Sequence, residues 1–297
     1  MNEKTVYEIE RPNLDLKPSG TRSHLPGAKT LLLGDTGTGK THAIRTFLEA
    51  GIQPFVVFTE PGMEIVNDLN MQGEPCKIHW TYIAPAAPDW TAMLDSAKKI
   101  NSMTLEQLAR LSDVQKKEYQ EFINILNALH DYTCDRCGRH FGDVSDWGTD
   151  RALIVDSLSG LNVMAMNLVV GSKPVKSMAD WGIALDNLER LLTKLTVDTR
   201  CFFVLTAHLE REVDEVTGGT QLMASTLGRK LAPRLPRFFS DVIHAKREGD
   251  KFTWSTVTTN VALKARNLPL ADKQPPSFKP LVDQWVKRGG LIEKEMK

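Results

Sequence analysis

Short apolar runs recur along the chain and have the length of buried β-strands. They cover residues 30–33, 54–58, 152–155 and 201–205. A continuous apolar run of about four to eight residues between turn signals is typical of a strand that is buried on both faces. Between these runs, apolar residues recur at helical spacing over residues 42–50, 158–170 and 181–195. This alternation predicts an α/β fold with a mainly parallel sheet flanked by helices.

The segment after the first apolar run carries the strongest chemical signal. The P-loop pattern G-x-x-x-x-G-K-[ST] is matched at every fixed position by Gly34-Asp35-Thr36-Gly37-Thr38-Gly39-Lys40-Thr41. Its glycines let backbone N–H groups face phosphate oxygens, while Lys40 would reach the β- and γ-phosphates and Thr41 would hold Mg²⁺. A chance glycine-rich turn does not explain the strand before it and the helix after it. The sequence therefore predicts that the chain binds ATP with Mg²⁺.

Two carboxylates follow apolar runs and are candidates for catalysis. Asp156 ends one run, where P-loop enzymes place the carboxylate on the metal side of Thr41. The next residue is Ser157, so the glutamate that many P-loop ATPases use there to activate water is missing. Glu60 follows another run and would supply that base, since parallel strands end at one edge of the sheet. A glutamate before Pro-Gly is also often a solvated turn residue, and this alternative stays open.

His208 comes shortly after the apolar run at residues 201–205. It stands at the end of the strand that follows the Asp156 strand, where P-loop ATPases sense the γ-phosphate. We therefore take His208 as a candidate sensor. A structural role in the core is the alternative.

Composition limits the kinds of protein that fit. The 297 residues are 41% hydrophobic and 25% charged, with 37 basic and 37 acidic side chains and a formal net charge of zero. A nucleic-acid site must therefore be a local patch rather than a property of the whole surface. The first residues lack an apolar signal region, and no run of about 18 apolar residues occurs. We therefore expect a cytoplasmic protein.

One such patch is predicted between residues 228 and 247. That stretch holds six basic residues against one acidic residue, with two phenylalanines among them. Basic side chains near aromatic rings can follow a phosphate backbone and stack on bases. The candidate contacts to single-stranded nucleic acid are Arg229, Lys230, Arg234 and Arg237. The alternative is a solvated charged face over core phenylalanines.

Four cysteines are too few for a disulfide scaffold in a chain of this length. Cys134-x-x-Cys137 precedes a glycine, as in zinc knuckles, where two thiolates on a tight turn occupy neighbouring corners of a tetrahedron. His130 and His140 are the candidate partners for a zinc ion, together with Cys76. A reduced pair without metal is the main competitor. A thioredoxin-like motif is disfavoured because no suitable βαβ context surrounds it.

A K-x-R pair completes the set of motifs. Lys264 and Arg266 alternate onto one face of a predicted strand over residues 261–266. We divide the chain into an N-terminal arm at 1–25, an ATPase domain at 26–270 and a tail at 271–297 that contains a short helix. The domain carries a helical insertion at 101–150 that includes the Cys-x-x-Cys pair.

These motifs together resemble the RecA-like AAA-family ATPases of bacteriophages, a group that includes the Sak-type single-strand annealing proteins. The resemblance covers roughly residues 26–270. It implies that Glu60 polarises the attacking water and that His208 couples the γ-phosphate to DNA-binding loops, here residues 171–180 and 209–228. It also implies that Lys264 and Arg266 reach the nucleotide of the adjacent subunit, so that the site is complete only in a ring or filament.

The implied function is ATP-dependent action on single-stranded DNA in phage recombination or replication, with a phage single-strand-binding protein as a candidate partner. Two alternatives share the same motifs: a helicase or helicase-loader motor, and a nucleotide switch that recruits a protein partner without DNA-stimulated hydrolysis. A small-molecule kinase is disfavoured because no arginine-rich lid is recognisable.

Overall fold

A seven-stranded sheet forms the centre of the molecule, in the order β3-β2-β4-β5-β1-β8-β9. The structure, a computed structural model, describes residues 25–69, 75–85, 89–110, 119–171, 173, 175–213, 219–228, 230–258 and 260–293. The strands of this sheet are β1 (Lys29–Leu33), β2 (Gln53–Phe58), β3 (His79–Tyr82), β4 (Arg151–Asp156), β5 (Phe202–Ala207), β8 (Asp241–Glu248) and β9 (Lys251–Ser255). All neighbours pair in parallel except β8 and β9, which form an antiparallel hairpin. The predicted α/β fold with a mainly parallel sheet is therefore confirmed.

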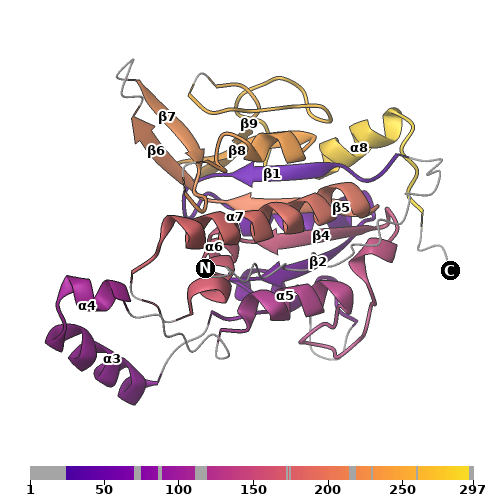
Figure 1. Ribbon diagram of the computed structural model, residues 1–297. Coiled ribbons are helices and arrows are strands. Elements are labelled where there is room, and N and C mark those ends of the chain that lie inside the picture. The colour runs from indigo at the N-terminus through magenta and orange to yellow at the C-terminus, as the bar shows by residue number, and fades with distance from the viewer. Residues whose placement is uncertain are drawn as a thin grey trace, which may run out of the picture.

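Helices cover both faces of this sheet (Figure 1). The longer helices are α3 (Trp90–Ser102), α5 (Glu121–His130), α6 (Leu158–Val170), α7 (Met178–Thr193) and α8 (Lys279–Lys287). The shorter ones are α1 (Lys40–Ala43), η1 (Ile44–Ala50), α2 (Glu64–Asn67), α4 (Leu105–Arg110), η3 (Val144–Asp146), η4 (Lys194–Asp198) and η5 (Leu235–Phe238). A second, two-stranded sheet is formed by β6 (Leu209–Val213) and β7 (Thr220–Ala224).

Side chains of the strands alternate between two hydrophobic cores. Leu33 of β1 belongs to the core under α5, α6 and α7, whereas Leu32 belongs to the core under η1 and α8. In the second core, the ring of Phe47 in η1 stacks on that of Phe278, which precedes α8, with 4.4 Å between centroids. Because the central strands are buried on both faces, they read in the sequence as continuous apolar runs.

Two local predictions differ from the structure. A single helix is expected over residues 42–50. The structure instead has one α-helical turn, α1, followed by the tighter helix η1. η1 ends at Ala50, and the next residue, Gly51, has a left-handed backbone conformation. The strand expected over residues 261–266 is absent there, and only isolated bridges join Val261 and Lys264 to neighbouring strands. The reason is that the backbone N–H groups of Arg266 and Asn267 donate to the buried carboxylate of Asp241, each at 2.7 Å, instead of to a strand.

The helices of the predicted insertion at residues 101–150 fall into two groups. α4 projects from the body of the molecule together with α3, which lies before the insertion and ends at Ser102 (Figure 1). Within the described residues α3 buries none of its side chains. α5 packs against α6 and contributes Phe122, Ile125 and Leu129 to the core. The N-terminal arm expected at residues 1–25 lies outside the described residues except for Leu25. In the described part of the chain, no helix combines the length and apolar character needed to cross a bilayer.

Candidate nucleotide-binding site

The P-loop connects the end of β1 to α1, and its backbone conformation depends on glycine. Gly37 and Gly39 have φ values of 76° and 80°, in the left-handed region that glycine tolerates best. A Cβ atom on Gly34 would lie 2.6 Å from the carbonyl oxygen of Ala245 in β8. The loop can therefore keep this path only with glycine at these positions.

Lys40 points back into this loop. Its Nζ donates to the carbonyl oxygens of Gly34 and Asp35 at 2.8 and 2.9 Å. Burial lowers the pKa of Lys40, while the carboxylates of Asp156, Asp35 and Glu60 oppose that shift. The ammonium group is thus held on the inner side of the loop by backbone carbonyl oxygens, which carry no net charge.

Asp156 at the end of β4 joins two hydroxyl groups. Thr41 Oγ1 donates to Asp156 Oδ2 at 2.7 Å, and Thr206 Oγ1 of β5 donates to Asp156 Oδ1 at 2.5 Å. β5 lies between β1 and β4, so Thr206 bridges the gap between the P-loop strand and the carboxylate. A hydroxyl and a carboxylate at one point form an oxygen donor set of the kind that Mg²⁺ prefers.

Glu60 and His208 face each other across the site. His208 Nε2 lies 3.6 Å from Glu60 Oε2, and the two side chains are 29% and 39% exposed. The end of β2 is fixed by Thr59, whose Oγ1 accepts from the backbone N–H of Ser157 at 2.8 Å and donates to its carbonyl at 2.9 Å. A Cβ atom on Gly160 would overlap Thr59. The ends of β2 and β4 are therefore locked together, which places Glu60 near Asp156.

A cavity of about 700 Å³ unites these residues. Its volume lies within the range of small-molecule and cofactor sites. The lining consists of Thr36, Gly37, Thr38, Gly39, Lys40, Thr41, His42, Glu60, Pro61, Gly62, Ile65, Asp156, His208 and Phe252. The structure thus brings together most of the P-loop, Glu60, Asp156 and His208, which the sequence singled out one by one.

Sequence reasoning missed the β8–β9 hairpin as part of this site. Phe252 lies against the P-loop, where a Cβ atom on Gly39 would be 3.0 Å from its ring. The guanidinium of Arg247 lies 5.3 Å from the centroid of that ring. The turn of the hairpin at Gly249-Asp250 is readable in the sequence, but its place beside the P-loop follows from the pairing of β8 with β1.

Lys264 and Arg266 lie near the starts of β1 and β8, at the opposite end of these strands from the P-loop. Lys264 pairs with Val242 near the start of β8, and Asp241 is level with Thr30 at the start of β1. The P-loop follows the opposite end of β1. Lys264 Nζ donates to the carbonyl of Phe239 at 2.6 Å, and burial together with Arg266 lowers its pKa. The Arg266 side chain is exposed. The two side chains therefore do not join the cavity of their own chain.

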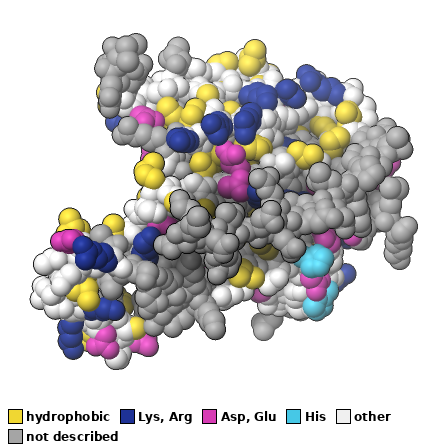
Figure 2. All heavy atoms as spheres, in the orientation of Figure 1, with side chains coloured by type: hydrophobic (Ala, Val, Ile, Leu, Met, Phe, Trp, Pro, Cys, Tyr) yellow, Lys and Arg dark blue, Asp and Glu magenta, His cyan; other side chains and the backbone are white. Residues whose placement is uncertain are grey.

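In the basic segment at residues 228–247, exposed basic side chains lie on buried residues and are partly neutralised by an acidic neighbour. Arg234 and Arg237 lie 3.6 and 3.9 Å from the carboxylate of Glu189 in α7, and Lys230 is exposed. Figure 2 shows a row of Lys and Arg side chains across the upper part of one face, with acidic side chains beside it. Phe239 is buried against the core, so it is not available to stack on a base. Arg229 lies outside the described residues.

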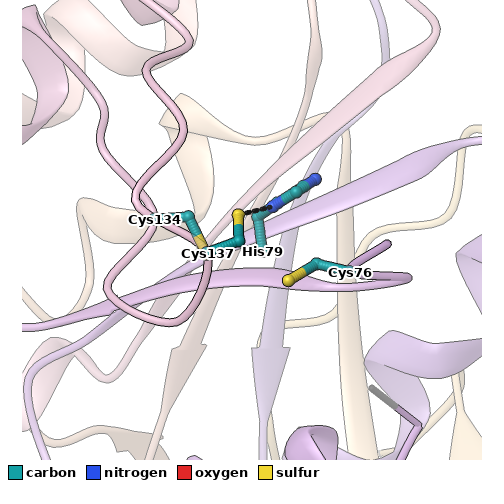
Figure 3. Close-up of side chains that lie close together, drawn as sticks. All are labelled: Cys76, His79, Cys134 and Cys137. Carbon is teal, nitrogen blue, oxygen red and sulfur yellow. Dashed lines mark hydrogen bonds between the residues drawn. The ribbon is translucent and has the colours of Figure 1, made fainter. Parts of the chain in front are cut away.

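The Cys-x-x-Cys pair lies beside a different histidine from those expected. Cys134 and Cys137 meet Cys76 and His79, with all four ligand atoms within 4.8 Å of one another (Figure 3). Burial, with Arg139 and Arg151 nearby, lowers the pKa of His79 to about 4, so its imidazole is neutral at pH 7.

The cluster therefore includes the three expected cysteines but neither His130 nor His140. His130 Nδ1 lies 3.0 Å from Asp143 Oδ2, and His140 Nδ1 lies 3.0 Å from Thr133 Oγ1, both on the surface. His79 was overlooked because it reads as part of a strand. The spacing Cys76-x-x-His79 was the signal that could have found it.

Comparison with known proteins places these features in a family. No curated protein matches the chain. Among solved structures, the crystal structure of the RadB recombinase matches with 12% identity and a TM-score of 0.34, over 78% of this chain and 81% of that chain. The family described as an AAA domain matches residues 26–267, which include β1, the P-loop, Asp156 and Arg266. The chain therefore belongs to this AAA domain family.

Proposed function

We propose that the chain is a RecA-like ATPase that hydrolyses ATP with Mg²⁺ and uses Glu60 to orient the attacking water. The observation that carries this proposal is the position of the Glu60 carboxylate, 3.6 Å from His208 and in the same cavity as Lys40 and Asp156. Both oxygens of Asp156 accept hydrogen bonds from threonines, which suits a role on the metal side. Glu60 is not needed on the metal side, so it is the better candidate for the base that activates water.

The remaining residues would supply electrostatic stabilisation. Lys40 would exchange the carbonyls of Gly34 and Asp35 for phosphate oxygens and offset the charge that develops on the γ-phosphate. Bound Mg²⁺ would neutralise charge on the β- and γ-phosphates. Thr41 and Asp156 would hold it through hydroxyl and carboxylate oxygens.

We further propose that the chain acts on single-stranded DNA in phage recombination or replication, within the cytoplasm of the host. His208 stands directly before β6, and its carbonyl accepts from the N–H of Ser225 at 2.8 Å after β7. A shift of His208 at the γ-phosphate would therefore move the β6–β7 hairpin. Further along the chain, Arg234 and Arg237 share the carboxylate of Glu189, which leaves one excess positive charge among these three groups for a phosphate backbone.

Self-association is part of the same proposal. Lys264 and Arg266 lie at the end of the strands away from the P-loop of their own chain, which supports a role at the cavity of a neighbour in a ring or filament. A phage single-strand-binding protein would be a further partner. The K-x-R pair would then make hydrolysis depend on assembly.

The test is ATP turnover with and without single-stranded DNA for the wild type and for Glu60→Gln. We expect DNA to raise turnover, and the substitution to lower it roughly 10²–10⁴-fold while ATP binding persists. Glu64→Gln is the matched control, because Glu64 is exposed on α2 and lies outside the cavity lining. An ATP turnover rate that does not change when DNA is added would favour the nucleotide switch. DNA-stimulated turnover with unidirectional movement along the strand would favour the helicase or loader.

A further inference from the structure

Three cysteines and one histidine meet where the insertion contacts the edge of the sheet (Figure 3). His79 is the first residue of β3 and Cys76 lies three residues before it, whereas Cys134 and Cys137 lie on the turn after α5. The four ligand atoms are within 4.8 Å of one another. We propose that these four side chains bind one zinc ion, which ties the insertion to β3. This site is separate from the nucleotide cavity and does not depend on the proposed ATPase function.

The geometry suits tetrahedral zinc. With Zn–S bonds of about 2.3 Å, neighbouring ligand atoms around the ion are roughly 3.8 Å apart. Cys137 Sγ already lies 3.6 Å from His79 Nδ1. The ligands come as two pairs with the same spacing, Cys-x-x-His and Cys-x-x-Cys, and each pair can take adjacent corners of the tetrahedron. The other ligand atoms are within 4.8 Å of one another, about 1 Å more than the spacing around a bound ion.

The turn that carries Cys134 and Cys137 is already shaped as a knuckle. Gly138 has a φ of 66°, and its N–H donates to the carbonyl of Cys134 at 2.8 Å. The N–H of Cys134 in turn donates to the carbonyl of Arg139 at 3.0 Å. Both sulfurs are therefore presented on the same tight turn without any rearrangement of the backbone.

The knuckle is docked on the free edge of β3. Asp135 donates its N–H to the carbonyl of Trp80 at 2.9 Å. Its carboxylate accepts from the N–H of Tyr82 at 2.7 Å and from the hydroxyl of Thr81 at 3.2 Å. These bonds continue the sheet beyond β3 and hold the two ligand pairs face to face. A zinc ion would add coordinate bonds that join the two ligand pairs directly.

The surroundings fix the histidine and balance the charge. The ring of His79 stacks on Phe55, with 4.9 Å between centroids, and also contacts Phe141 at 4.4 Å. Its orientation is therefore set by packing, as expected for a ligand held in place by its neighbours. The guanidinium of Arg136 lies 3.5 Å from Cys76 Sγ. A zinc ion with three thiolates carries a net negative charge, which this arginine offsets.

The first measurement is the metal content of full-length protein purified in reductant without a metal-affinity step. We expect one zinc ion per wild-type chain. Cys137→Ser and His79→Gln should lose it, whereas His130→Gln and His140→Gln should retain it, because these two histidines are bound to other groups on the surface. Cys137 is exposed, so its substitution leaves the core intact even if His79→Gln does not fold.

A second measurement reads the ligands directly. With Co²⁺ in place of zinc, the wild type should show tetrahedral cobalt bands with thiolate charge transfer. These bands should be absent in Cys137→Ser, which is expected to lose the metal, and should stay unchanged in His140→Gln. Loss of metal from His140→Gln but not from His79→Gln would overturn the assignment. So would metal-free wild type with all thiols free, or with a disulfide among these cysteines.

Discussion

The hydroxyl of Thr206 donates to Oδ1 of Asp156 at 2.5 Å, so the carboxylate proposed for the metal side is anchored from β5 as well as from the P-loop. Thr206→Val keeps the shape of the side chain but leaves a buried carboxylate oxygen without its donor. We expect a loss of about 1–3 kcal/mol in the free energy of unfolding. We also expect weaker Mg²⁺-dependent ATP binding, because the carboxylate is no longer held in place.

Chemical denaturation and nucleotide titration of the same samples check this prediction. Thr253→Val is the matched control, since the Thr253 hydroxyl on β9 has no hydrogen-bond partner among the described residues. That variant should be close to neutral. Equal effects of the two substitutions would show that the Asp156 contact is not the cause.

Gly160 in α6 controls the relation between the ends of β2 and β4. In Gly160→Ala the new methyl group would overlap Thr59, which holds Ser157 through two hydrogen bonds. We expect destabilisation of about 1–3 kcal/mol by overpacking, together with lower ATP turnover as Glu60 shifts.

Gly182→Ala, in helix α7, should have the opposite effect on the free energy of unfolding. A Cβ atom at Gly182 of α7 would meet nothing within 4 Å in the described part of the chain. Alanine should therefore stabilise the protein by roughly 0.5–1 kcal/mol through its higher helix propensity. Thermal melts of both variants give the comparison, and a stabilising Gly160→Ala would contradict the packing argument.

The sequence predicted the parts of the site that lie close to their own motif and missed those that depend on long-range pairing. Leu32 and Leu33 are buried on opposite faces, so β1 and its P-loop are legible from a continuous apolar run. Phe252 joins the site only because β8 pairs with β1, and no local pattern encodes that contact. His79 was missed for a similar reason, because its partners Cys134 and Cys137 lie far along the chain.

Arg266 lies at the end of the strands away from its own P-loop. We therefore predict that the catalytic site is shared between subunits. With the proposed role in trans, Arg266→Ala should lower ATP turnover by roughly 10³-fold, the effect typical of removing an arginine finger, while the isolated chain still binds ATP. Mixing Arg266→Ala with Glu60→Gln tests the sharing. About a quarter of the interfaces in a random head-to-tail assembly would combine an intact Glu60 with an intact Arg266, so activity should reappear on mixing. Two inactive variants that stay inactive together would contradict a trans role.

The start of α7 predicts a dependence of stability on pH. Hydrogen bonds from the Lys173 side chain and from Ser177 lower the pKa of Asp180 to about 2, as part of a capping box. Because the folded-state pKa lies below the unfolded value of 3.8, this contribution is present above about pH 4 and is lost as the pH falls toward 2. Asp180→Asn should reduce the melting temperature at pH 7 and have less effect near pH 2. Asp186→Asn, an exposed pair partner of Arg190 on the same helix, is the control and should change little at either pH.

Phe252 predicts a contribution of the β8–β9 hairpin to nucleotide binding. Its ring lines the cavity beside Gly39 and carries Arg247 above it at 5.3 Å. Phe252→Ala should weaken ATP binding by about tenfold, since an aromatic contact is worth about 0.5–1.5 kcal/mol beyond its buried area. Lys251→Ala is the control, because Lys251 is exposed on the same strand and lies outside the cavity lining. Calorimetric titration with a non-hydrolysable ATP analogue measures both variants. Unchanged affinity in Phe252→Ala would mean that the hairpin only covers the P-loop and does not contact the nucleotide.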